Sequence, residues 1–177
     1  TSFRSLEDIR CTSTSLVGLA GVFRDQEDLT GAIALILECL NLSRESGYKP
    51  TEAKALRLLG KCDLTQGSLE SARAHFIDSL QIAREMGHHQ DIAESMDGLA
   101  SVAAAQADYD RSVKLFSAAK GLRVSVGIYL PEVVAAENQK WKEMALSSLG
   151  ESAYETAAVQ GALLSVEQAI ELMITDD

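Results

Sequence analysis

The stretch Leu59–Gly87, LGKCDLTQGSLESARAHFIDSLQIAREMG, decides the fold because two other segments of the chain repeat its pattern. It aligns without a gap on Leu19–Gly47, LAGVFRDQEDLTGAIALILECLNLSRESG, and on Leu99–Gly127, LASVAAAQADYDRSVKLFSAAKGLRVSVG. The offset is 40 residues each time, from 19 to 59 and from 59 to 99. A fixed period of this length is typical of repeat architectures in which each repeat is one supersecondary unit.

Small residues recur at two positions of the repeat, and a large apolar residue recurs at a third. The small columns are Ala20, Gly60 and Ala100, and then Ala32, Ala72 and Ser112; the large column is Ile36, Phe76 and Phe116. Apolar spacings of three, four and seven residues place such positions on one face of a helix. Small residues facing large ones let two helices pack closely.

Helix start and stop signals recur with the same period. Good N-cap residues precede each second helix and a glycine follows it, where the left-handed C-cap conformation is favoured. These residues are Asp28, Ser68 and Asp108 at the starts and Gly47, Gly87 and Gly127 at the ends. Each repeat is therefore predicted to be a helix, a tight turn and a second helix, at about 50–66 and 69–86 in the middle repeat.

The pattern resembles the tetratricopeptide repeat family, which pairs two helices through a Leu-Gly or Leu-Ala step and an Ala, an aromatic residue and a second small residue. The matching residues of the middle repeat are Leu59-Gly60, Gly67, Ala72, Phe76 and Ser79. The period is 40 where the common repeat has 34. The resemblance covers residues 11–127 and implies an all-α fold, a right-handed α-α solenoid of about three helix pairs. It also implies a non-catalytic protein–protein interaction scaffold.

One position departs from the family pattern. The family's usual helix-A aromatic is present as Phe23, but Asp63 and Ala103 replace it in the following repeats. A carboxylate at this position has no explanation in the repeat pattern.

The last fifty residues do not continue the register. Residues 128–177 are predicted to form capping helices at 131–149, 152–160 and 166–174, the last with a capping box of Ser165 and Gln168. A solenoid needs an atypical terminal unit to cover its apolar end. The side chains expected to supply that cover are Trp141, Met144, Leu146 and Leu149. Residues 1–10 are expected to form an N-terminal segment compatible with the end of a preceding helix.

A second resemblance concerns the C-terminal region. The chain is similar there to the ending of bacterial LuxR-like, STAND-type regulatory ATPases, and the matching residues are Leu130-Pro131, Leu149-Gly150-Glu151, Tyr154, Gly161 and Leu164–Ala169. This resemblance implies the repeat portion of a bacterial signalling or transcriptional regulator. The nucleotide-binding and DNA-binding motifs of those proteins have no counterpart in this sequence.

Composition limits the classes of function. The chain has 177 residues and a formal net charge of −10, which disfavours direct contact with nucleic acid. Its three cysteines, Cys11, Cys39 and Cys62, form no CxxC pair and are expected to be reduced thiols. No apolar run is long enough to span a membrane. We therefore expect a cytoplasmic protein that contacts neither nucleic acid nor membrane.

No pattern of catalytic residues stands out. The stretch Arg57–Leu64, RLLGKCDL, comes close to a phosphate-binding loop, but Ala55 stands where the first glycine is needed and Cys62 where Ser or Thr is needed. His88 and His89 are predicted to lie in a polar loop rather than to bind metal. We expect no enzyme activity, no catalytic residue, no metal and no cofactor.

The strongest candidate for a binding site is a row of cations on the first helix of the middle repeat. Lys54, Arg57 and Lys61 are spaced by three and four residues and so share one helical face. The row indicates either a contact with an anionic partner, such as an acidic peptide, or ion pairs with neighbouring repeats. Glu94 and Asp97 occupy the positions of Lys54 and Arg57 in the next repeat and favour the second interpretation.

The predicted groove accordingly comprises Lys54, Arg57, Lys61, Leu64, Glu94 and Asp97. Three hypotheses on the function of the protein remain open. The leading one is binding of a protein or peptide, acidic if the cation row takes part. The alternative is a small-molecule sensor that binds an effector in the concave groove. The third is self-association through an open end of the solenoid.

Overall fold

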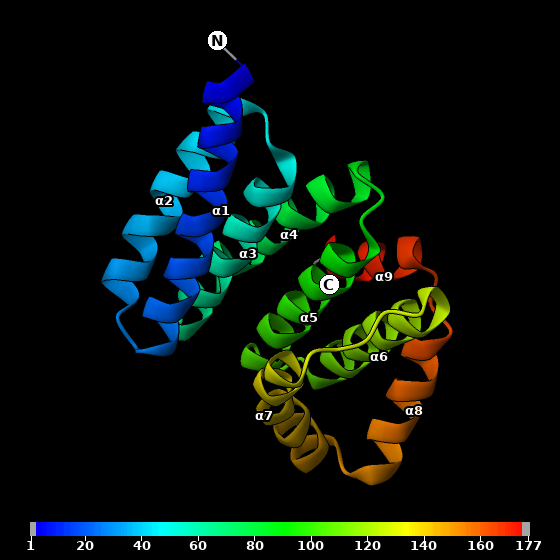
Figure 1. Ribbon diagram of the computed structural model, residues 1–177. Coiled ribbons are helices and arrows are strands. Elements are labelled where there is room, and N and C mark those ends of the chain that lie inside the picture. Colours follow the sequence, from blue (N-terminus) through cyan, green and yellow to red (C-terminus); the bar gives the residue numbers. More distant parts are fainter. Residues whose placement is uncertain (1–2, 175–177) are drawn as a thin grey trace. The chain divides into compact units, whose positions relative to one another are not determined.

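The computed structural model describes residues 3–174, and the side chains of residues 7–173 (Figure 1). Within residues 3–174 the chain forms nine α-helices and no β-strand. The helices are α1 (Phe3–Asp25), α2 (Leu29–Ser46), α3 (Lys49–Thr65), α4 (Leu69–Glu85), α5 (His89–Ala105), α6 (Tyr109–Val126), α7 (Glu132–Leu149), α8 (Glu151–Ala162) and α9 (Val166–Ile174). The predicted all-α fold is therefore confirmed.

The chain divides after Gly87 into two compact units. In unit 1, α1 packs on α2, α3 packs on α4, and α3 also contacts α1 and α2. In unit 2, α5 packs on α6, and α6 also contacts α7, α8 and α9. Consecutive helices form packed pairs, which is the arrangement of a tetratricopeptide-like α-solenoid.

The residues predicted to cap the second helix of each repeat lie at the ends of α2, α4 and α6. Asp28 accepts a hydrogen bond from the Gly31 amide at 2.9 Å, and Asp108 accepts one from the Arg111 amide at 3.2 Å. The glycines after α2, α4 and α6 have φ angles in the left-handed region, at 68° for Gly47, 63° for Gly87 and 69° for Gly127. Ser68 occupies the N-cap position of α4 but makes no side-chain capping bond.

The small residues of the repeat lie where the paired helices touch. A Cβ atom on Gly60 would lie 3.1 Å from the Phe76 ring and 3.2 Å from the Ala72 carbonyl oxygen. Ala20, Ala32, Ala72, Ala100 and Ser112 are each fully buried. The size of these side chains therefore sets the distance between the two helices of each pair.

A hydrogen bond recurs between paired helices of unit 1 at equivalent positions. The Cys39 thiol donates to the Ser13 carbonyl at 3.1 Å, and the Ser79 hydroxyl donates to the Ala53 carbonyl at 2.9 Å. Ser13 and Cys39 precede Ala53 and Ser79 by 40 residues. Both donors are buried, so each bond satisfies a group that would otherwise destabilise the fold.

The C-terminal helices begin and end close to the predicted residues. The capping box is present: Ser165 accepts from the Gln168 amide at 3.2 Å, and Gln168 accepts from the Ser165 amide at 2.9 Å. The prediction that Met144 and Leu146 cover the apolar end is wrong, since each is 43% exposed. Leu149, which was also predicted to cover that end, does pack, beside Tyr109 and Tyr154, against the cluster that Ala145 of α7 and Ala157 of α8 form with Val113 of α6.

None of the helices in the described part of the chain is both apolar enough and long enough to cross a lipid bilayer.

Candidate functional site

The cation row lies on one face of α3, and its members differ in burial. Lys54 is exposed, Lys61 is half-buried, and Arg57 is only 6% exposed. Leu64, the next-to-last residue of the helix, is half-buried. The row therefore presents one exposed lysine and one half-buried lysine, with a buried arginine between them.

The other two faces of α3 explain why the cations share one side. Leu56, Leu59 and Cys62 belong to the apolar core formed with α2, while Gly60 meets Phe76 of α4. Positions three and four residues from each other point the same way on a helix. The apolar columns consequently leave the remaining face to Lys54, Arg57 and Lys61.

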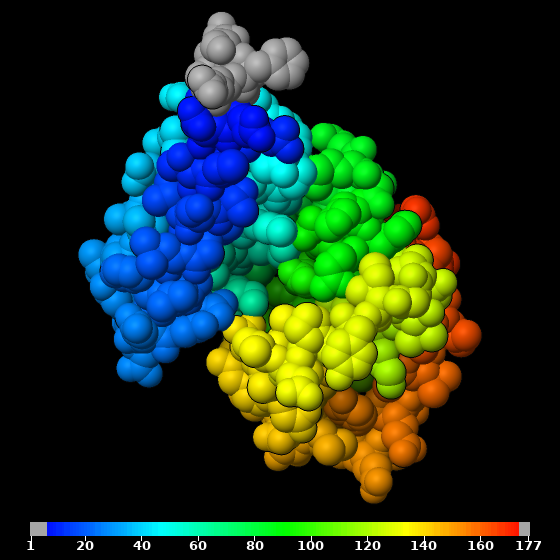
Figure 2. All heavy atoms as spheres, viewed as in Figure 1, coloured from blue at the N-terminus to red at the C-terminus, as the bar shows by residue number. Residues whose placement is uncertain are grey.

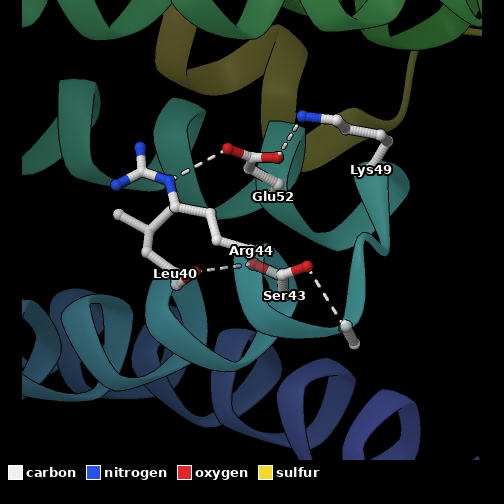
Figure 3. A network of polar contacts seen from close by, with 6 residues as sticks. Leu40, Ser43, Arg44, Lys49 and Glu52 are labelled. Atoms are coloured by element: carbon white, nitrogen blue, oxygen red, sulfur yellow. Dashed lines mark hydrogen bonds and ion pairs between the residues drawn. The ribbon is translucent and has the colours of Figure 1, made fainter. Parts of the chain in front are cut away.

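The start of α3 is fixed to the end of α2 by a nearly buried carboxylate (Figure 3). Glu52, 6% exposed, accepts from Arg44 Nε at 3.0 Å and from Lys49 Nζ at 2.8 Å. On the same turn of α2, the Ser43 hydroxyl donates to the Leu40 carbonyl at 3.2 Å. Burial alone would raise the pKa of Glu52, but the hydrogen bonds and charges of Lys49 and Arg44 outweigh it and hold that pKa below its ordinary value. Glu52 is therefore an anchor for the helix that carries the cation row.

Asp63, which the repeat pattern left unexplained, pairs with a histidine. Its Oδ2 lies 2.7 Å from Nδ1 of His75, across the contact between α3 and α4. Phe23 and Leu35 occupy the equivalent positions in the preceding repeat, and both pack against the apolar core. A polar pair thus replaces an apolar pair at the same place in the repeat, and Asp63 takes part in helix pairing.

The acidic members of the predicted groove lie on α5 of unit 2. Glu94 is half-buried and accepts from Gln90 Nε2 at 2.5 Å. Asp97 is only 4% exposed, and its Oδ2 lies 2.6 Å from Nη2 of Arg123 on α6. Asp97 is therefore part of the packing between α5 and α6.

A positively charged cluster surrounds Asp97. Burial raises the pKa of Asp97, while the charges of Arg123 and Lys142 and the nearby side chain of Asn138 act in the opposite direction. Burial, together with the charges of Lys120 and Arg123, lowers the pKa of Lys142 although Asp97 opposes that shift. The Lys142 ammonium also lies 5.2 Å from the centre of the Phe116 ring. The cluster joins α5, α6 and α7 by charge as well as by apolar contact.

Unit 2 also has a shallow hollow between α6, α8 and α9. Its volume is about 350 Å³, and it is lined by Lys114, Gln160, Leu164, Gln168, Glu171 and Leu172. The Lys114 ammonium forms an ion pair with Asp110 at 2.5 Å. The lining combines apolar side chains with amides and one charge of each sign.

The histidines and cysteines considered in the sequence analysis lie at helix ends or in the core of the fold. His88 is the N-cap residue of α5, and its Nδ1 lies 2.5 Å from Asp91 Oδ2, while His89 is the first residue of that helix. Burial raises the pKa of the Cys39 thiol to about 11 and also raises that of Cys62. Among the side chains that the structure describes, no three His, Cys, Asp or Glu residues are grouped as metal ligands.

Comparison with known families agrees with the fold. Residues 11–85 match the tetratricopeptide repeat family model, which supports a tetratricopeptide repeat domain in this part of the chain. Repeats of this family generally mediate protein–protein interactions and are typically non-catalytic. No curated protein matches the chain.

The sequence predicted that Lys54, Arg57 and Lys61 share one face of a helix, but it did not reveal which of them are accessible. It also missed Arg123, which pairs with Asp97, and it did not connect His75 with Asp63. These pairs are 26 and 12 residues apart. The 40-residue alignment contained a signal for the second pair, because a polar residue replaces an apolar one in both columns of the same repeat.

Proposed function

We propose that this protein is a non-catalytic scaffold that binds an acidic peptide segment of a protein partner along the exposed face of α3. The observation that carries the proposal is the accessible position of Lys54 and Lys61 on one face of a helix whose other faces are packed. These are two cations in a chain of net charge −10. Ammonium groups one or two turns apart suit carboxylates along an extended or helical peptide.

The three cations of the row would have different roles in binding because they differ in burial. Lys54 and Lys61 would contact the carboxylates, whereas Arg57 would contribute its charge from the interior. The Glu52 anchor would keep the row in place by holding the start of α3 on α2. Because exposed ion pairs are weak one by one, binding would depend on several of them and would weaken as salt is added.

The proposal is tested with a fluorescent hexaglutamate peptide and fluorescence anisotropy at low salt. Reversing both accessible charges, Lys54→Glu with Lys61→Glu, is expected to weaken binding by about tenfold or more, roughly 1.4 kcal/mol. The matched control is Lys140→Glu with Lys120→Glu, which makes the same change of net charge at exposed positions outside the row. Equal loss of binding in both double variants would show a general charge effect and refute the site.

The wider context is proposed from the resemblances described above. We infer that the chain is the repeat portion of a bacterial signalling or transcriptional regulator, placed in the cytoplasm, and that its repeats are a 40-residue variant of the tetratricopeptide type. Helices α2, α4 and α6 begin at residues 29, 69 and 109, a spacing that supports this variant. Sequencing the complete gene tests the inference, which predicts an ATPase core upstream of this region.

A small-molecule sensor is the second candidate, favoured by the hollow between α6, α8 and α9. Its mixture of leucines, amides and the Lys114 and Glu171 charges suits a small zwitterionic effector such as an amino acid. A screen of the amino acids by thermal unfolding tests this candidate, since a ligand of the folded state raises the melting temperature. A shift that Gln160→Ala abolishes would support the sensor, and no shift with any amino acid would refute it.

A further inference from the structure

Three cations gather around one carboxylate in unit 2, where α7 packs on α5 and α6. Lys120 and Arg123 lie on α6, Lys142 lies on α7, and the carboxylate is Asp97 of α5. The charges of Lys120 and Arg123 act on Lys142 in one direction, and that of Asp97 acts in the other. Three positive charges against one negative charge leave an excess of two, in a chain whose formal net charge is −10. The cluster therefore suits a group that adds negative charge.

Two hydrogen-bond donors of this cluster are buried without an acceptor among the residues that the structure describes. They are Nε of Arg123 and Nδ2 of Asn138, and the two residues are only 4% and 5% exposed. Arg123 directs its other nitrogens, Nη1 and Nη2, to Asp97 at 3.4 and 2.6 Å. Asn138 precedes Lys142 by four residues, so their side chains are neighbours on one face of α7. Since buried donors normally have acceptors, these two indicate an acceptor that the neighbouring side chains do not supply.

Lys142 is the nucleophilic group of the cluster. Burial lowers its pKa most, and the charges of Lys120 and Arg123 lower it further against the opposing charge of Asp97. An ordinary lysine, with a pKa of about 10.4, has only about one amine in a thousand neutral near pH 7.4. Because only the neutral amine has a free electron pair, Lys142 is a better nucleophile at neutral pH than an exposed lysine.

The surroundings of Lys142 select among the electrophiles that react with amines. An acyl group would leave a neutral amide, which adds no negative charge to the cluster. Carbon dioxide leaves a carbamate, whose carboxylate oxygens accept hydrogen bonds and whose charge replaces that of the ammonium group. The excess of two positive charges in the cluster then falls to zero. Figure 2 shows α7, gold in that view, at the surface of unit 2, so a small uncharged molecule reaches this helix from solvent.

We propose that Lys142 binds carbon dioxide as a carbamate whose oxygens accept hydrogen bonds from Arg123 Nε and Asn138 Nδ2. The neutral Nζ attacks the carbon atom, a C–N bond forms, and the electron pair of one C=O π bond moves onto oxygen. Nζ then releases a proton to water, so one amine and one carbon dioxide give one carbamate and one proton. The site belongs to unit 2 and the cation row to unit 1, so either proposal can fail without the other.

Chemical trapping tests the proposal on the whole folded chain without any substitution. The protein is equilibrated with isotopically labelled carbon dioxide and bicarbonate near neutral pH, and triethyloxonium ion then converts carbamates into stable ethyl esters. Peptide mass spectrometry is expected to find labelled ester at Lys142 at least about tenfold more often than at Lys140. Lys140 is the internal control because it is exposed on the same helix. No ester at Lys142, or equal amounts at both lysines, would overturn the proposal and leave the two donors to water.

The donors are tested through Asn138→Leu, which removes one of them and keeps a side chain of similar size. The trapped fraction at Lys142 is expected to fall about tenfold or more, the loss expected from one hydrogen bond to a charged group. The matched control is Gln139→Leu, which removes an exposed amide from the next position and should leave trapping unchanged. Circular dichroism checks that both variants are folded. Trapping in folded Asn138→Leu equal to that in Gln139→Leu would contradict the site.

The melting temperature gives a readout that does not depend on trapping. A ligand that binds only the folded state stabilises it, so carbon dioxide at constant pH and ionic strength should raise the melting temperature of the wild-type protein. Lys142→Arg keeps a positive charge but has no primary amine, and it should lose this increase. Lys140→Arg should retain it. An increase that persists in Lys142→Arg would assign the effect to another group and overturn the proposal.

Discussion

Removing one partner of the buried ion pair in unit 2 is expected to destabilise the protein strongly. The change is Arg123→Met, which keeps an unbranched apolar side chain in place of the aliphatic part of arginine and removes its charge. Arg123 Nη2 and Asp97 Oδ2 are 2.6 Å apart, and each side chain is only 5% exposed. Losing one member of such a pair typically costs about 3–5 kcal/mol because the other charge stays buried. Lys142 and Asn138 remain close to Asp97, so we expect a cost near the lower end, about 3 kcal/mol.

The double variant Asp97→Leu with Arg123→Met is expected to recover most of that loss. Replacing both charges with apolar groups is often neutral or stabilising. The first repeat supports this expectation, since it has the uncharged residues Val17 and Ser43 at the positions equivalent to Asp97 and Arg123. Urea unfolding measures both variants, followed by circular dichroism and by the fluorescence of Trp141, the single tryptophan, which reports on unit 2.

The dependence of the stability of Arg123→Met on pH gives a second test of the buried ion pair. Burial already raises the pKa of Asp97, and removing Arg123 raises it further because a favourable charge is lost. In Arg123→Met the folded state therefore binds a proton more readily than the unfolded state. The penalty should shrink as the pH falls through the folded pKa of Asp97.

A surface pair provides the control for the same measurement. Lys114→Met removes the ion pair with Asp110, whose side chain is 56% exposed, and should cost no more than about 1 kcal/mol. A cost for Arg123→Met as small as that for Lys114→Met would refute the reasoning. So would a double variant no more stable than Arg123→Met alone.

Three further predictions concern other contacts. Gly161→Ala should cost about 1–3 kcal/mol in urea unfolding, because its new Cβ would overlap the Lys114 backbone and push α8 from α6; an unchanged urea midpoint would contradict this. Glu52→Gln should lower stability by about 0.5–1 kcal/mol at neutral pH. The wild-type pKa is depressed, so this difference should vanish as the pH falls through the folded pKa of Glu52, and a constant difference would count against the ion pairs. In the folded protein a thiol reagent should label exposed Cys11 quickly and buried Cys39, with its pKa of about 11, only slowly; equal rates would rule out the packing of Cys39.

The sequence was informative wherever one residue acts within its own helix. Asp28 and Gly47 could be assigned to opposite ends of α2 because capping depends on neighbours three or four residues away. Ser165 and Gln168 form the predicted capping box for the same reason. The small residues Ala72 and Gly60 were identified by their recurrence, since close helix contact leaves a pattern in every repeat.

Polar pairs between helices were harder to predict. Arg123 has no charged equivalent in the other repeats, so the alignment gave no reason to join it to Asp97. His75 and Asp63 differ from their equivalents together, and such a joint change from apolar to polar is the trace that a pair of this kind leaves. The accessibility of Arg57 was not evident either, because a cation next to two lysines resembles them in sequence until the fold buries it.

Equivalent positions in a repeat share their chemistry but not their surroundings. Leu19 and Leu59 are the same residue at the same place in two helix pairs, and the second is buried because α2 precedes its helix. The alignment identifies both as buried positions and cannot distinguish them, because the difference lies in a neighbouring element and not in the residue.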